Sequence, residues 1–205
     1  MNKAQQKAID FLRSYRMDPA DVDFEDNLTV FSEQMVQGLM GKDSCLEMIP
    51  TYLETVHEIP VNQRVIVADA GGTNFRVATV YFDEAKQPVI ENLQKATMPA
   101  VESELSKEAF FDAMAAYFRD VMDAADKIGF CFSYPTDIQP NKDGRLIRFV
   151  KEIRAPEVVG QLVGENLNRS LASMGADAKH VVLLNDTVAT LLAGVTYTVR
   201  LSGVD

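Results

Sequence analysis

The sequence contains few cysteines and no long apolar run. Only Cys45 and Cys131 are present among 205 residues, and their spacing fits neither a zinc knuckle nor a redox pair. We therefore expect two buried, unreactive thiols in a reducing compartment and no metal cage. No stretch of about 18 apolar residues is found, and the N-terminus lacks a signal-peptide core. No membrane partner is expected, and a cytoplasmic location is the default.

Basic residues are also scarce. Thirty acidic residues face twenty basic ones, which leaves a net charge of −10. This charge repels phosphate backbones and argues against general binding to nucleic acid or to anionic membranes. A phosphate-bearing ligand would therefore need a local site. Because 47% of the residues are hydrophobic and no repeat is visible, the chain is typical of an ordinary globular protein with one ample domain or two small ones.

The chain changes character near residue 60. Apolar residues recur at helical spacing over residues 4–15 and 28–40, so the first 45 residues are predicted to be helical. After Pro60 the pattern becomes that of strands. We therefore expect an N-terminal helical segment over residues 1–60 and an α/β domain over residues 61–205.

The α/β domain is predicted to alternate strands and helices. The expected elements are strands at 64–70, 75–82 and 89–98, a helix from Ser106 to about 125, a strand at 127–133, a loop at 136–154 with room for a short hairpin, a helix from Pro156 to about Gly175, a fully buried strand at 181–184 and a helix at 188–195. This β-β-β-α-β-α-β-α order predicts a mixed sheet with a three-stranded antiparallel part and parallel strands added across helices.

A glycine-rich turn joins the first two predicted strands. Gly71 and Gly72 allow positive φ, so the turn is able to direct successive backbone N–H groups into one concavity. Thr73 and Asn74 add side-chain donors, and Arg76 adds positive charge. These features suit a phosphate group, although an ordinary tight hairpin would explain the two glycines equally well.

Asp69 ends the apolar strand before this turn. A carboxylate there is unfavourable unless it has a partner. A hydrated Mg²⁺, held through water, or the donors of the turn would serve as that partner. The alternative is an Asx turn with no ligand.

Polar residues follow two other predicted strands. Asn185 and Asp186 lead from a strand into a helix, where they would bracket adjacent sugar hydroxyls, because ligands in open α/β sheets bind beyond the carboxyl ends of the strands. Asp186 would otherwise be an N-cap. Ser133 ends another strand and offers a donor, unless it belongs to a plain turn. Lys151 lies in a basic loop, where a solvated charge is the usual explanation.

In this order and at this spacing, these residues resemble the hexokinase family, within the wider sugar-kinase group of actin-like ATPase folds, which have a ribonuclease H-like domain. The similarity covers nearly the whole chain, and its parts are residues 48–52, residues 69–77, residues 132–135, Lys151 and residues 183–187. The resemblance implies an α/β domain of that fold, with ATP and Mg²⁺ as cofactors and a hexose as substrate.

The resemblance also implies a role for each residue. Asp69, Gly71, Gly72, Thr73, Asn74 and Arg76 would form the cofactor-binding turn, with the two glycines, Thr73 and Arg76 facing the ATP phosphates. Ser133, Lys151 and Asn185 would hold the hexose. Asp186 would be the catalytic base, taking the proton from the C6 hydroxyl as the phosphoryl group arrives.

Two departures from the family pattern stand out. Val150 occupies the place where hexokinases usually have a threonine, which puts sugar selectivity in doubt. The larger C-terminal domain of hexokinases, with a second phosphate segment and the adenosine site, has no counterpart here. We therefore interpret the chain as an N-terminal small-domain fragment, inactive alone, whose partner is the C-terminal half of the same enzyme.

Two alternatives stay open. A repressor-related sugar kinase would share the glycine turn, but Cys45 and Cys131 cannot supply its cysteine-rich zinc site. A non-catalytic sugar-sensing module would use the same cleft to bind and signal. The presence of Asp186 favours the enzyme, since a sensor does not need a base.

Overall fold

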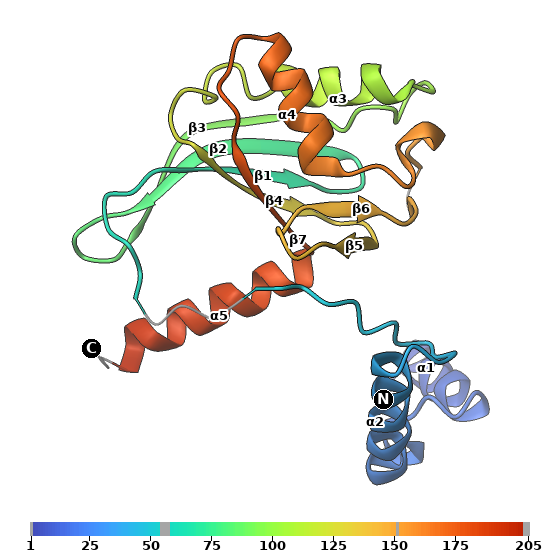
Figure 1. Cartoon of the computed structure of the whole chain (residues 1–205). Coiled ribbons are helices and arrows are strands. Elements are labelled where there is room, and N and C mark those ends of the chain that lie inside the picture. The colour runs from blue at the N-terminus through green and yellow to red at the C-terminus, as the bar shows by residue number, and fades with distance from the viewer. Residues whose placement is uncertain (1, 54–57, 151, 203–205) are drawn as a thin grey trace. The chain divides into compact units, whose positions relative to one another are not determined.

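The chain divides into two compact units, Met1–Ile49 and Pro50–Asp205. The computed structural model describes residues 2–53, 58–150 and 152–202. The first unit contains helices α1 (Lys3–Ser14), η1 (Pro19–Asp21) and α2 (Phe24–Leu39), which confirms the helices predicted for the N-terminal residues (Figure 1). A capping box between Asn2 and Gln5 begins α1, because each side chain accepts a hydrogen bond from the other residue's backbone N–H.

The second unit is built on a five-stranded mixed sheet. Its elements in chain order are β1 (Val65–Ala70), β2 (Asn74–Phe82), β3 (Pro88–Thr97), α3 (Lys107–Ala116), β4 (Lys127–Phe132), β5 (Thr136–Ile138), β6 (Gly144–Leu146), η2 (Pro156–Val158), α4 (Val163–Ser173), β7 (His180–Leu184) and α5 (Asp186–Ser202). The sheet order is β3-β2-β1-β4-β7, and β5 and β6 form a separate hairpin. Strands β1 to β3 are antiparallel, whereas β4 and β7 run parallel to β1. The predicted mixed sheet is therefore confirmed, as is the short hairpin within the long loop.

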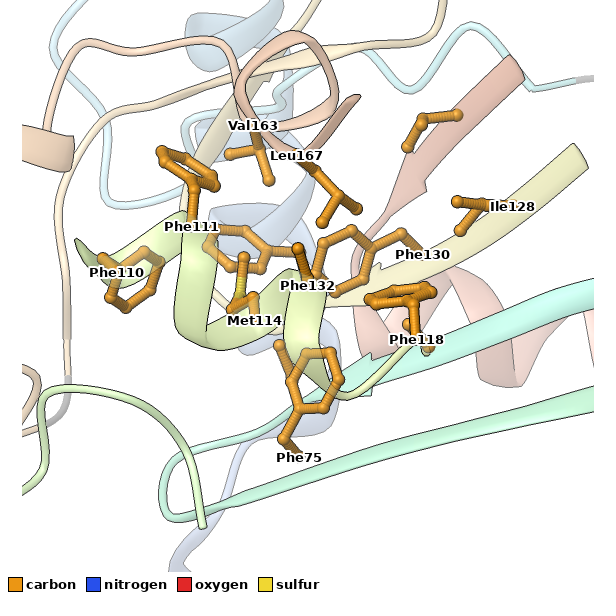
Figure 2. Close-up of a cluster of buried hydrophobic side chains, with 14 of the residues drawn as sticks. Phe75, Phe110, Phe111, Met114, Phe118, Ile128, Phe130, Phe132, Val163 and Leu167 are labelled. Carbon is orange, nitrogen blue, oxygen red and sulfur yellow. The ribbon is translucent and has the colours of Figure 1, made fainter. Parts of the chain in front are cut away.

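The hydrophobic core lies between one face of this sheet and helices α3 and α4 (Figures 1 and 2). Alternate residues of β1 are buried because successive side chains of a strand point to opposite faces. Aromatic rings dominate the core, and Phe75 of β2 packs edge-on against Phe130 of β4 with ring centroids 6.1 Å apart. Each fully buried side chain of this size contributes about 1.5–3 kcal/mol relative to an exposed one. The core thus fixes β1, β2 and β4, the strands that carry most of the candidate site.

The prediction of a helix that starts at Pro156 is wrong about where the helix begins. Pro156 begins only the short η2, and the chain then reverses at Gly160, whose φ is +82°. Helix α4 begins after Leu162, which has no side chain able to cap it. Asp143 of the β5–β6 hairpin caps it instead, accepting hydrogen bonds from the backbone N–H groups of Gly164 and Glu165 at 2.6 and 2.9 Å.

Two other predictions need correction. Helix α3 ends at Ala116 rather than near residue 125, because the chain tightens into turns in which Phe118 and Val121 each donate to the carbonyl three residues earlier. Strand β7 is not fully buried. Val181 and Leu183 face the core, whereas Leu184 lines an open groove of about 420 Å³ on the other face of the sheet.

No helix in the described part of the chain is long and apolar enough to cross a membrane.

Candidate active site

Three strand ends meet at one edge of the sheet. The parallel strands β1, β4 and β7 are in register, so Asp69 pairs with Cys131 and Cys131 pairs with Leu184. The residues that follow these strands therefore emerge together. The 71–74 turn follows β1, Ser133 follows β4, and Asn185 follows β7. The structure thus brings the three polar segments singled out in the sequence to the same edge.

Asp69 has a protein partner on the neighbouring strand β2. Its Oδ2 atom accepts a hydrogen bond from Arg76 Nη1 at 2.7 Å, because Asp69 and Arg76 are opposite each other in the β1–β2 ladder. Both side chains remain about 40% exposed. Asp69 therefore forms an ion pair across the turn with Arg76, one of the groups that the sequence assigned to the cofactor-binding turn, and no Asx turn is needed to stabilise its carboxylate.

The 71–74 turn is tied down on both sides. Gly71 N–H donates to the Asn74 carbonyl at 3.0 Å, and Met98 N–H donates to the Thr73 carbonyl at 2.9 Å. Within the described residues, the N–H groups of Gly72 and Thr73 have no partner in the protein. These two donors are therefore available to an anion.

The backbone conformation of the turn differs from the expectation. In the part of the chain that the structure describes, positive φ is found at Gly41, Gly160 and Gly175 and at no other glycine. The two turn glycines thus do not use the left-handed region. The turn presents its donors with ordinary backbone angles.

Cys131 lies at the centre of the cluster. Burial, followed by the negative charge of Asp69, raises the pKa of its thiol to about 11; a hydrogen bond from Ser133 opposes the shift, and the charge of Asp186 adds to it. One thiol therefore interacts with side chains from all three strand ends. The prediction of two buried thiols is wrong, because Cys45 is exposed and Cys131 is only partly buried. The sequence did not single out Cys131 for the site, although it lies only two residues before Ser133.

Asn185 and Asp186 have different local roles. Asn185 Oδ1 accepts hydrogen bonds from the backbone N–H and the hydroxyl of Thr187, at 3.0 and 2.7 Å, and so caps the start of α5. Asp186 is exposed in the first turn, and its Oδ1 accepts from Thr187 N–H at 2.8 Å. Since Asn185 is the capping residue, the carboxylate of Asp186 remains accessible to a ligand.

Of the two remaining candidate residues, Ser133 is described by the structure and Lys151 is not. Ser133 is 9% exposed, so its hydroxyl is at the inner wall of the site. Lys151 lies outside the described residues. Its neighbour Val150 is 54% exposed and presents an apolar surface where a hydroxyl would be expected in the family.

The family model described as hexokinase matches residues 10–196. The chain is 29% identical over 196 residues to a hexokinase of Schistosoma mansoni and covers 91% of its own length and 43% of that protein. It is 35% identical over 172 residues to glucokinase-1 of Kluyveromyces lactis, with 75% of this chain and 35% of that one covered. The chain therefore spans less than half the length of these relatives.

The fold is also similar to that of a solved structure. A hexokinase from Schistosoma mansoni in complex with glucose aligns with 96% of this chain and 46% of that one, at a TM-score of 0.66 and 25% identity. The sheet order, the converging strand ends and the match over residues 10–196 agree with one another. The chain belongs to the hexokinase family.

Proposed function

We propose that this chain is the sugar-binding part of an ATP-dependent hexose kinase, which transfers the γ-phosphoryl group of ATP to the C6 hydroxyl of a glucose-like sugar. The observation that carries the proposal is the register of β1, β4 and β7, which ends the three strands at one edge of the sheet and is followed there by the 71–74 turn, Ser133 and Asp186. The turn and the carboxylate of Asp186 thus follow the two strands that flank β4, at the strand ends where ligands bind in open α/β sheets. The neighbour crystallised with glucose supports a hexose as the acceptor.

In this reaction Asp186 is the general base. Its carboxylate is exposed at the start of α5 and is able to accept the proton of the C6 hydroxyl. Ser133 and Asn185 hold the sugar beside it, and Lys151 completes that set. Because phosphoryl transfer passes through a loose transition state, positioning and electrostatics contribute more than the base, whose share is about 10²–10⁴-fold.

The residues present fit a nucleotide phosphate. The N–H groups of Gly72 and Thr73, for which no partner is found among the described residues, are donors for phosphate oxygens. Thr73 adds its hydroxyl, and Arg76 follows the turn on β2. Asn74 donates its side-chain amide to Thr73 Oγ1 at 3.1 Å and so orients that hydroxyl.

The fit to Mg²⁺ is that of a hydrated ion. Over residues 2–53, 58–150 and 152–202 no group of three or more metal-binding side chains is found, and Mg²⁺ on nucleotides needs only one or two carboxylates together with phosphate oxygens and water. Asp69 is the residue that would hold it through water. A bound Mg²⁺ would offset the negative charge of the phosphates.

The test is phosphoryl transfer by the full-length protein. Asp186→Asn is expected to lower kcat by at least about 100-fold while sugar binding is retained, measured as hexose phosphate formed by ³¹P NMR. Asp123→Asn is the matched control, since Asp123 is also exposed but lies after α3, away from the strand ends. Glucose binding without any transfer in the wild type would identify a sugar sensor and disprove the enzyme.

We also propose that the 205-residue chain has little activity by itself. More than half the length of each relative lies outside the matched region, and a cleft with one wall neither excludes water nor completes a catalytic site. Hexose-dependent ATP turnover by this chain at the rate of the full-length enzyme would contradict this statement.

A further inference from the structure

Tyr134 connects two strand ends that are 63 residues apart in sequence. It follows Ser133 at the end of β4, and its side chain is almost fully buried. Its hydroxyl donates a hydrogen bond to the carbonyl of Gly71 at 2.6 Å. One residue earlier, Ser133 N–H donates to the carbonyl of Ala70 at 3.2 Å. The residues that follow β4 are thus joined to the 71–74 turn by one hydrogen bond and to the end of β1 by another.

The bond to Gly71 sets the direction of a different group. In a trans peptide the carbonyl of one residue and the N–H of the next point in opposite directions, and the structure has no cis peptide among its described residues. When Tyr134 holds the Gly71 carbonyl, the Gly72 N–H must point away from Tyr134. Among the residues that the structure describes, this N–H is one of the two backbone donors of the turn for which no protein partner is found.

A Gly-Gly peptide has little resistance of its own to rotation. Neither residue has a Cβ, so both tolerate the large changes in ψ and φ that reverse a peptide plane. The hydrogen bond from Tyr134 therefore fixes the orientation of the Gly71–Gly72 peptide, which the two glycines alone do not fix.

The phenol itself is held in place by packing. The Tyr134 ring lies 4.9 Å from that of Phe132 and 5.0 Å from that of Phe149, with the second pair nearly perpendicular. These contacts prevent the hydroxyl from following the peptide if the peptide rotates. Tyr134 thus acts as a rigid support rather than as a flexible donor.

We propose that Tyr134 is a positioning residue for phosphoryl transfer: it fixes the Gly71–Gly72 peptide so that the Gly72 N–H faces the nucleotide phosphates. The proposal rests on the proposed function of the turn. It assigns no direct contact between Tyr134 and either substrate. As a consequence, Tyr134, which directly follows the proposed sugar-binding residue Ser133, controls the affinity for the nucleotide.

The first test is the kinetics of Tyr134→Phe in the full-length protein, since this change keeps the ring and removes only the hydroxyl. The KM for MgATP is expected to rise about tenfold, the size of one well-made hydrogen bond, with the KM for glucose unchanged within about twofold. Tyr81→Phe is the matched control, because it also removes only a phenolic hydroxyl and lies near the opposite end of β2 from the turn. Unchanged MgATP kinetics in Tyr134→Phe, or the same loss in both variants, would overturn the proposal.

The second test does not depend on activity. In the 205-residue chain, tripolyphosphate is expected to shift the ¹⁵N–¹H signal of Gly72 in the wild type and in Tyr81→Phe, and to shift it at least about fivefold less in Tyr134→Phe. A full-length protein that phosphorylates no hexose would disprove the proposed function, and the Gly72 signal would still decide the role of Tyr134. Equal shifts in all three proteins, or no shift in the wild type, would refute that role.

Discussion

Arg76 and Asp69 neutralise each other across the β1–β2 ladder, with Arg76 Nη1 only 2.7 Å from Asp69 Oδ2. The cation and the carboxylate that flank the 71–74 turn are therefore paired with each other when no ligand is bound. A nucleotide phosphate would attract the guanidinium, and a hydrated Mg²⁺ would attract the carboxylate. The pair thus keeps both groups oriented at the entrance of the turn.

This arrangement separates stability from activity. Because both side chains are about 40% exposed, Arg76→Gln is expected to change the free energy of unfolding by no more than about 1 kcal/mol. Activity of the full-length protein should fall by at least about tenfold in kcat/KM for MgATP. Chemical denaturation and steady-state kinetics measure the two effects.

The control for Arg76 is Arg64→Gln on the same sheet. Arg64 pairs with Glu91 at 3.0 Å with similar exposure, but it lies at the opposite end of β1 from the turn. We expect a similar small change in stability and normal kinetics. Equal kinetic losses in both variants would mean that Arg76 has no special relation to the nucleotide.

Asp143 is predicted to be a main determinant of stability in the second unit. Its carboxylate accepts hydrogen bonds from the N–H groups of Gly144, Gly164 and Glu165, and it is only 7% exposed. Asp143→Ala leaves buried donors unsatisfied and removes the cap of α4, so we expect a loss of about 2–3 kcal/mol by urea denaturation. Asp137→Ala in the same hairpin is exposed and should lose less than about 0.5 kcal/mol; a similar loss in both would contradict the capping role.

Asp143 also shows why the first residue of α4 could not be predicted from the sequence. The apolar periodicity of residues 158–171 predicted a helix correctly, but its first residue is set by a carboxylate 20 residues upstream. No local pattern indicates that contact. In the same way, the glycine turn and the carboxylate of Asp186 were visible as motifs, whereas the bond from Tyr134 to Gly71 depends on the parallel pairing of β1 and β4.

The sequence was more informative where strands alternate. The order of the strands along the chain and the hairpin at residues 71–74 followed from runs of strand-forming residues and from the turn glycines. The ion pair of Asp69 was also within reach of sequence reasoning, because a hairpin closed at residues 71–74 places residue 76 opposite residue 69. The partial exposure of one face of β7 could not be predicted, since a short apolar run is equally typical of a strand covered on one face and of a strand covered on both.

Thr79 is predicted to make the folded protein slightly less stable than a valine would at the same position. Its side chain is fully buried, and among the described residues its hydroxyl has no hydrogen-bond partner. Thr79→Val keeps the shape and removes the unsatisfied group, so the free energy of unfolding is expected to rise by up to about 1 kcal/mol. Thr136→Val is the comparison, because the Thr136 hydroxyl donates to the Tyr134 carbonyl at 2.9 Å and its removal should destabilise by about 1 kcal/mol. A loss of stability in Thr79→Val would mean that its hydroxyl is satisfied in solution.

The last prediction concerns stability at alkaline pH. Burial raises the pKa of the Tyr134 phenol to about 12 and, with the charge of Asp69, that of the Cys131 thiol to about 11. In the unfolded chain these groups ionise near pH 10 and about 8.5. For both groups the pKa is higher in the folded protein than in the unfolded chain. Their contribution to the free energy of unfolding is therefore fully present below about pH 8.5. It is lost as the pH rises to about 11 for Cys131 and about 12 for Tyr134.

Urea midpoints measured from pH 8 to 11 test this dependence. We expect Cys131→Ala to remove the part of the decline that begins near pH 8.5, because the variant has no thiolate to form on unfolding. Cys45→Ala is the control, since Cys45 is an exposed free thiol and its removal should leave the decline unchanged. If Cys131→Ala and the wild type lose stability with the same slope, the thiol between Asp69 and Asp186 is not the group that titrates.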